Sequence, residues 1–183
     1  MAERERADAR RNRERLVAAA AAAFAAHDGP VSLEGIARAA GVGIGTLYRH
    51  FPTRDALVEA VYRAELAEVS ACAPALVASH PPVEALRLWM RRYADFVAAK
   101  QGMAESLLAI FDAGIVERSD TRAAIVDAVA TLLEAGAAEG SLRADVRPDD
   151  VVSSLLGIFL ASGDAEQSAR LVDLLIDGLV ASR

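Results

Sequence analysis

The chain has 183 residues, a hydrophobic fraction of 54% and a formal net charge of −6, so it is long enough for one domain or two small ones with a substantial core. Its single cysteine, Cys72, excludes an intrachain disulfide and a cysteine zinc site. The acidic total argues against a nonspecific coat on nucleic acid.

The composition favours an all-α fold, because glycine and proline are few, alanine-rich runs recur and no stretch alternates β-branched residues. We expect about nine helices. The N-terminus is charged and lacks a signal-peptide core, and the apolar run at 16–26 is too short to cross a bilayer. A soluble cytoplasmic protein with no membrane contact is therefore expected.

The charge is distributed unevenly along the chain. Residues 1–54 hold 9 basic and 6 acidic side chains, a net +3, whereas residues 55–183 hold 11 and 20, a net −9. A basic N-terminal part on an acidic body would direct one end of the molecule at DNA.

The first segment is rich in arginine. Residues 1–9 are expected to be flexible, either as an arm along the minor groove of DNA or as a solvated tail. A helix should then run to about His27, with an inner face of Leu16, Ala20, Ala23 and Phe24, before Asp28-Gly29-Pro30 breaks it.

The stretch from Val31 to Asp55 predicts two short helices joined by a glycine turn. Ser32 is a favourable N-cap, Gly41 is placed to end the first helix with a positive φ, and Gly43 allows a further turn. The second helix should span Ile44–His50 and direct Leu47 and Phe51 to the core. Pro52 would then stop it, and Thr53 would cap the next helix.

Two helices joined in this way form a helix-turn-helix, whose second helix fits the major groove of DNA. Arg49 can bind a guanine or a phosphate, and Thr46 can contact a thymine methyl or a base edge. The Tyr48 hydroxyl can reach a phosphate. Gly45 leaves room for a phosphate near the helix N-terminus. The alternative is a helical hairpin inside an ordinary bundle, where Tyr48 and His50 are merely half-buried.

The run G-V-G-I-G-T-L-Y-R-H-F-P-T-R-D-A-L resembles the recognition-helix signature of the tetracycline-repressor (TetR) family, and the resemblance covers about Arg10 to Tyr62. It departs at Pro52, where family members often carry a basic residue. It implies a DNA-binding domain over residues 1–52 and a helical ligand-binding and dimerisation domain over residues 53–183. The residues expected to serve DNA binding are Ser32, Gly43, Ile44, Gly45, Thr46, Tyr48, Arg49, His50 and Arg54.

The second part of the chain predicts four further helices before the last two, over about 53–71, 83–100, 103–113 and 121–139. Pro74, Pro81 and Pro82, Gly102, and a polar segment at 117–120 should separate them. The apolar residues Trp89, Tyr93, Phe96, Met103, Leu107 and Phe111 either line a cavity for a small molecule or form plain core.

The last two helices are apolar almost all round, over 151–160 and 171–180, after Pro148 and two aspartates that suit a helix start. We interpret Asp149 and Asp150 as capping residues rather than metal ligands. Such wide apolar faces need cover on both sides, which predicts a two-fold dimer in which these helices form a four-helix bundle. The predicted interface residues are Leu155, Phe159, Leu171, Leu175 and Leu179; the alternative is a monomer with both helices interior.

Together these features predict a dimeric transcriptional regulator, a repressor, that binds a near-palindromic double-stranded operator. The resemblance to the TetR family further implies that a small-molecule effector binds the C-terminal helices and releases it from DNA. The alternative is a helical DNA-binding or partner-binding protein without an effector. The sequence has no nucleophile elbow, phosphate loop, zinc-protease motif or dinucleotide fingerprint, so no enzymatic activity, cofactor or metal is expected.

Overall fold

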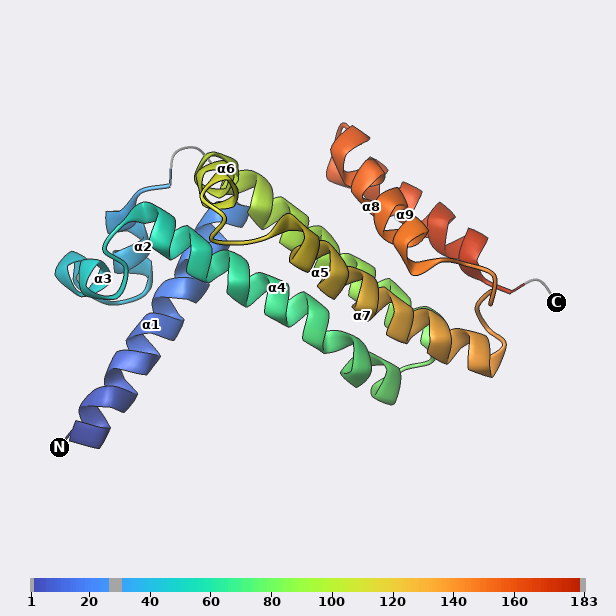
Figure 1. The fold of residues 1–183 in the computed structure, drawn as a ribbon, viewed down its shortest axis with the longest axis horizontal. Coiled ribbons are helices and arrows are strands. Elements are labelled where there is room, and N and C mark those ends of the chain that lie inside the picture. Colours follow the sequence, from blue (N-terminus) through green and yellow to red (C-terminus); the bar gives the residue numbers. More distant parts are fainter. Residues whose placement is uncertain (1, 27–30, 182–183) are drawn as a thin grey trace. The chain divides into compact units, whose positions relative to one another are not determined.

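The computed structural model describes residues 2–26 and 31–181, and this part of the chain holds nine α-helices (Figure 1). Their bounds are α1 Ala2–Ala25, α2 Leu33–Ala39, α3 Ile44–His50, α4 Arg54–Ser79, α5 Pro82–Gly102, α6 Ala104–Asp112, α7 Arg118–Glu139, α8 Pro148–Ala161 and α9 Ala165–Leu179. The bridge between Leu142 and Val180 is isolated and forms no named strand. The predicted all-α fold is therefore confirmed.

The helices form two compact units. The first contains the described chain up to Glu65 together with Ala98–Glu117, and the second contains Leu66–Val97 together with the described residues from Arg118 on. These compact units divide α4 between Glu65 and Leu66 and place α6 in the first unit. The division into functional domains between residues 52 and 53 stays a prediction.

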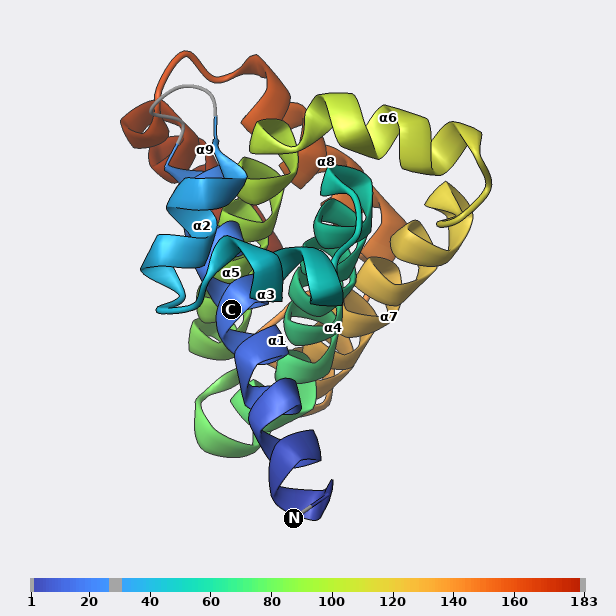
Figure 2. The same ribbon diagram turned by 90° about the vertical axis from the view of Figure 1, so that its left-hand side faces the viewer.

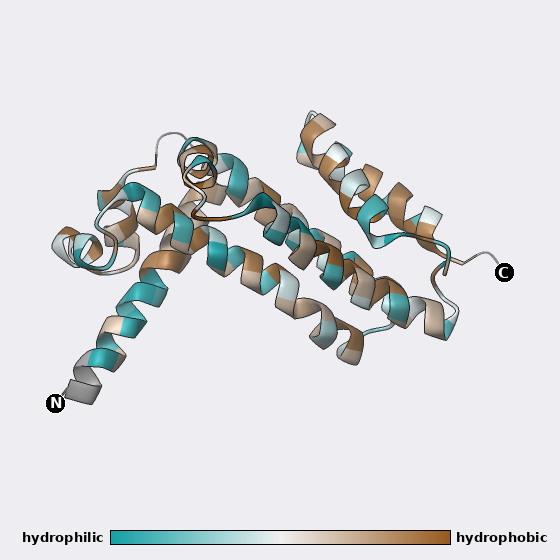
Figure 3. Cartoon of the chain, viewed as in Figure 1, coloured by the Kyte–Doolittle hydropathy of each residue, from teal (hydrophilic) through white to brown (hydrophobic). Residues whose placement is uncertain are grey.

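The start of α1 differs from the expected flexible arm over residues 1–9, because the helix begins at Ala2. Ion pairs along the helix support it: Asp8 pairs with Arg11, and Arg10 Nε lies 2.9 Å from Glu14 Oε1. Pairs at these spacings stabilise a helix modestly. Hydrophilic residues dominate the first half of α1 and hydrophobic ones the second (Figure 3). The expected helix end at His27 and the break after it lie outside the described residues.

Two later helix boundaries also differ from the prediction. Helix α4 continues through Pro74 to Ser79, and α7 begins at Arg118 inside the segment expected to be polar loop. Proline removes one backbone hydrogen bond from a helix. Near Pro74, burial of Val69 and Ala73 and a 2.8 Å hydrogen bond from Trp89 Nε1 to the Val69 carbonyl hold α4 in place. Tertiary packing thus overrides the local signal.

The core of the first unit joins α1, α2 and α3 to the beginning of α4, and Figure 2 shows the first three helices face on. Its buried side chains include Leu16, Phe24, Ile36, Leu47, Phe51, Leu57, Val61 and Tyr62. Helix α6 packs through Phe111, whose ring is perpendicular to the Tyr62 ring with 5.7 Å between the ring centroids. Beyond α6, the Ile115 carbonyl accepts a 2.9 Å hydrogen bond from Arg63 Nη2.

In the second unit α7 packs on α8 and α8 packs on α9. Arg122 Nη2 lies 2.8 Å from Asp149 Oδ1 and joins α7 to the start of α8. The loop after α7 is closed by Arg143, which pairs with Asp145 at 2.8 Å; this hydrogen bond lowers the pKa of the Asp145 carboxyl. None of the helices in the described segments combines the length and apolar composition that a bilayer span requires.

Candidate nucleic-acid interface

The helix-turn-helix forms as the sequence predicts. The Ser32 hydroxyl accepts a 3.0 Å hydrogen bond from the Gly35 amide and caps α2, and Gly41 has φ +66°, which L residues rarely adopt. Gly43 differs from the prediction: its φ is −73°, so it caps α3 without needing glycine's freedom. Helix α3 then spans Ile44–His50, the predicted recognition helix.

The faces of α3 divide as the interpretation requires. Leu47 and the following Phe51 are buried, at 0% and 1% exposure, and anchor the helix to the core. Tyr48 is 47% exposed and Ile44 37%, and Arg49 is also exposed. A short helix is thereby fixed on one side and open to a partner on the other.

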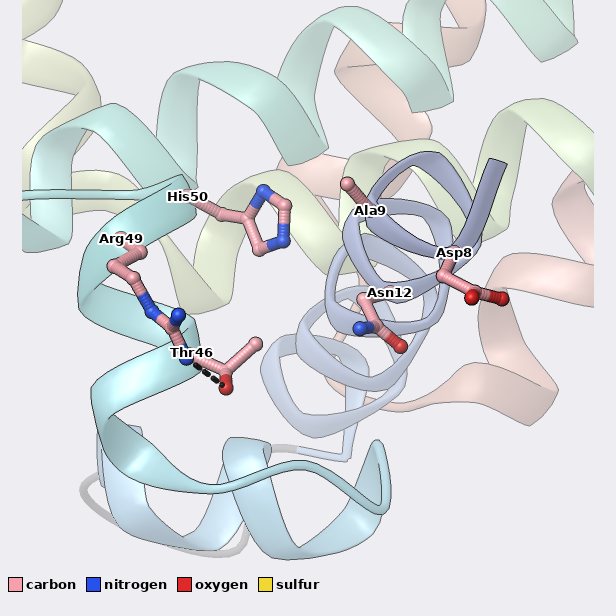
Figure 4. A pocket seen from close by; sticks show the side chains of 6 residues that line it. All are labelled: Asp8, Ala9, Asn12, Thr46, Arg49 and His50. Carbon is pink, nitrogen blue, oxygen red and sulfur yellow. Dashed lines mark hydrogen bonds between the residues drawn. The ribbon is translucent and has the colours of Figure 1, made fainter. Parts of the chain in front are cut away.

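Arg49 folds along its own helix. Its Nε donates to the Gly45 carbonyl at 3.3 Å. Its Nη2 donates to the Thr46 hydroxyl at 3.0 Å, as Figure 4 shows. The guanidinium is thus held beside the exposed face of α3. It retains further N–H donors, because a guanidinium carries five.

Arg54, which the sequence assigned to DNA binding, makes intramolecular contacts. Its Nη1 donates to the Val31 carbonyl at 2.8 Å, and its guanidinium carbon lies 5.5 Å from the centroid of the Phe24 ring. Arg54 therefore ties the start of α4 to the segment before α2 and to α1. Thr53 caps α4 as predicted, accepting from the Ala56 amide at 3.1 Å.

A groove of about 360 Å³ lies between α1 and α3 (Figure 4). Its lining residues are Asp8, Ala9 and Asn12 from α1 and Thr46, Arg49 and His50 from α3. The sequence predicted the three α3 residues as site residues and did not predict the three from α1. The sequence did carry one signal for the α1 side. Asp8, Asn12, Leu16 and Ala20 are each four residues apart, so the two polar residues lie in line with the inner face of α1.

The six residues predicted to line a ligand cavity divide between the two units. In the second unit the Trp89 and Tyr93 rings stack with their centroids 5.4 Å apart, and the centroid of the Phe96 ring lies 6.1 Å from that of Tyr93. In the first unit Met103 and Leu107 are buried and Phe111 is half-buried. A role in ligand binding stays a prediction for all six.

The predicted interface residues on α8 and α9 are not equally exposed. Leu155 and Leu179 are 0% and 4% exposed and pack inside the chain, whereas Phe159, Leu171 and Leu175 are half-buried. The structure instead exposes two leucines that the prediction omitted, Leu160 at 68% and Leu174 at 67%. Figure 3 shows hydrophobic residues along both helices.

Neither a metal site nor a reactive thiol stands out. Among the residues that the structure describes, no group of three or more His, Cys, Asp and Glu side chains could hold an ion. Burial raises the pKa of the Cys72 thiol above its ordinary value, although nearby Arg92 acts in the opposite direction. Less thiolate at neutral pH makes Cys72 a weak nucleophile.

A helix-turn-helix with an open second helix, at the head of an all-helical chain, defines a DNA-binding transcriptional regulator. Comparisons agree: residues 16–61 match the bacterial regulatory proteins of the tetR family, and residues 81–181 match the SbtR-like transcriptional regulator C-terminal domain. No curated protein matches the chain.

Solved structures place the chain more closely. The TetR transcriptional regulator SCO0520 from Streptomyces coelicolor is 45% identical with a TM-score of 0.84, over 93% of this chain and 99% of that one. A TetR transcription regulatory protein from Mycobacterium vanbaalenii is 37% identical with a TM-score of 0.75, over 96% and 99%. The chain belongs to the TetR family of transcriptional regulators. A gamma-butyrolactone receptor (ArpA like protein), 22% identical with a TM-score of 0.57 over 94% and 90%, shares the fold.

Proposed function

We propose that this regulator is a dimeric repressor that binds a near-palindromic operator through α3 and leaves it when a small molecule binds. The observation that carries the proposal is the division of α3 into a buried anchor, Leu47, and an exposed face with Tyr48 and Arg49. In the major groove Arg49 would read a guanine edge, Thr46 a thymine methyl or base edge, and the Tyr48 hydroxyl would bind a phosphate.

Dimerisation is supported by the exposed side of α9. Leu171, Leu174, Leu175 and Gly178 recur at spacings of three, four and seven, which places them on one helical face. Leu160 on α8 is equally exposed. A second copy would cover these leucines, and its two-fold axis would place the two α3 helices about 34–36 Å apart, or a multiple of it, for successive major grooves.

Release by an effector is supported by the continuity of α4. Three residues separate it from the end of α3, and it runs unbroken from Arg54 to Ser79. A shift of its far end would therefore change the position of α3. The effector must bind the geometry that does not fit DNA more tightly, because equal affinity for both geometries shifts nothing.

The test is selection of bound sites from random duplex DNA with purified protein in the absence of added small molecules. A palindromic consensus is expected, and a reporter driven from it should be repressed when the protein is expressed. A non-palindromic half-site would contradict the dimer, an activated reporter would contradict repression, and no enrichment would contradict specific DNA binding.

A DNA-binding regulator without an effector is the second candidate. It is favoured by Trp89 and Tyr93, which are 0% and 5% exposed and stack with an interplanar angle of 8°, as side chains of a filled core do. A thermal-shift screen of the purified protein separates the candidates. Compounds that raise its melting temperature and release the selected operator support the effector, and stabilisation without release supports the alternative.

A further inference from the structure

The first turns of α1 extend beyond the hydrophobic core. The described residues of α1 from Arg6 to Arg15 include none that is buried, and burial begins at Leu16. Even so, this part of the chain is helical, with the ion pairs Asp8–Arg11 and Arg10–Glu14 along it. A stiff, solvated helix of this length contributes little to the core, so its function must be sought on its surface.

That surface is basic. Five exposed arginines stand against two acids between positions 6 and 15. They form two rows: Arg6, Arg10 and Arg13 at spacings of four and seven, and Arg11 and Arg15 at a spacing of four. Arg10 is 82% exposed even with its partner Glu14 in place, so its charge remains accessible.

The two rows border the face of α1 that meets the recognition helix. Asp8, Ala9 and Asn12 lie between the rows on the helix surface and form one wall of the groove whose other wall is Thr46, Arg49 and His50 (Figure 4). The position is fixed by Arg13, whose guanidinium carbon lies 4.8 Å from the centroid of the Phe51 ring at the end of α3. Arg15 Nη2 also donates to Asn12 Oδ1 at 2.8 Å.

We propose that α1, from Arg6 to Arg15, is a second DNA-binding element that holds a backbone phosphate segment of the operator in and beside the groove between α1 and α3. The ligand class is the sugar-phosphate backbone of duplex DNA. Arginine and asparagine donors suit phosphate oxygens, and the rows of arginine provide counterion release without reading bases. The negative charge of Asp8 on the groove wall, which would repel a phosphate, is offset by its ion pair with Arg11. The proposal rests on the proposed function, because it places α3 in the adjacent major groove.

The test variant is Arg6→Gln/Arg10→Gln/Arg11→Gln. Arg10 and Arg11 pair with acids of the same helix, and all three side chains are exposed, so the fold should be retained. The matched control is Arg91→Gln/Arg147→Gln/Arg170→Gln, which removes three exposed arginines of the second unit. Circular dichroism checks that both variants remain helical.

Affinity for the selected operator is measured by fluorescence anisotropy from low to moderate salt, with random duplex of equal length alongside. The test variant should lower the slope of log affinity against log salt by about 0.9 for each phosphate that arginine no longer neutralises, whereas the control keeps the wild-type slope. The ratio of operator to random affinity should stay within about twofold for the test variant, because phosphate contacts carry little sequence information.

An unchanged slope for the test variant, or an equal loss in the control, would overturn the proposal. A changed base preference would show that α1 reads bases instead, and would overturn it too. Failure of the proposed function is distinct: wild-type protein would then bind operator and random duplex equally. In that case the slopes on random duplex still decide whether α1 binds phosphates.

Discussion

At the scale of single residues, Arg49 has the clearest consequence for DNA recognition. In the free protein its Nε and Nη2 donate to the Gly45 carbonyl and the Thr46 hydroxyl, which holds the side chain along α3 and leaves its remaining N–H donors for a base edge. We expect Arg49→Ala to weaken binding to the cognate operator by about 1–3 kcal/mol and to relax preference at one base pair. Titration of operators with single base-pair changes measures both effects.

Arg91→Ala, on an exposed side chain of α5, is the control for Arg49→Ala and should leave both affinity and preference unchanged. Equal losses on cognate and random duplex would identify Arg49 as a phosphate contact rather than a base contact.

Arg54 supports a different expectation. Because it bonds the Val31 carbonyl and covers the Phe24 ring, Arg54→Ala should lower the free energy of unfolding by about 1–2 kcal/mol. Urea titration at one fixed protein concentration measures this. Arg54→Lys keeps the charge but has no planar fork, so it should recover little of the stability. Full stability with a shallower salt dependence of DNA binding would instead support the DNA contact predicted from sequence.

At the scale of helices, the sequence predicted those helix ends that depend on neighbouring residues and missed those that depend on packing between helices. The ends of α2 and α3 follow from Ser32 and Gly41, whose effects act within a few residues. The passage of α4 through Pro74 depends on burial against other helices, which no local window contains. The start of α1 was missed because a densely charged segment was interpreted as solvated chain rather than as a helix with its own ion pairs.

The candidate site shows the same limit. Periodicity placed Leu47 inside and Tyr48 outside, and the structure agrees. Periodicity could not tell the inward side of α8 and α9 from the side that a partner would cover, because their apolar faces are wide. It therefore omitted Leu174 and included Leu155. The internal contacts of Arg54 and the groove on α1 arise from residues far apart in sequence, so spacing alone could not reveal them.

The end of α5 is packed too closely against α1 for a larger residue. A Cβ on Gly102 would lie 2.0 Å from the Phe24 carbonyl oxygen, which is backbone and cannot rotate away. Gly102→Ala should therefore lower the free energy of unfolding by about 1–3 kcal/mol, despite alanine's better helix propensity. Chemical denaturation measures the change.

Gly43→Ala is the matched control for Gly102→Ala, because its φ is negative and a Cβ there meets nothing within 4 Å. Its unfolding free energy should stay within about 0.5 kcal/mol of the wild type. Equal stability of the two variants would show that α5 and α1 separate easily at this point.

At the scale of the whole molecule, charge is unevenly distributed along the chain, and the most exposed leucines lie in its acidic part. The first 54 residues carry a net +3 and the remainder a net −9, so electrostatic attraction to DNA favours the helix-turn-helix end. Leu160 of α8 and Leu174 of α9 lie in this acidic part, which repels DNA, and this agrees with the proposal that a second copy of the chain covers them. The proposed function thus assigns DNA binding and self-association to different parts of the chain.

The proposed dimer gives the last prediction. Leu174 is 67% exposed, so Leu174→Asp costs the single chain little apolar burial but would place a charge in the interface between copies. We expect the variant to stay helical, to sediment as a monomer and to bind the operator much more weakly. Leu108→Asp, on a leucine of α6 that is 58% exposed, is the matched control and should remain dimeric. A dimeric Leu174→Asp variant with full operator affinity would show that α9 is not the dimer contact.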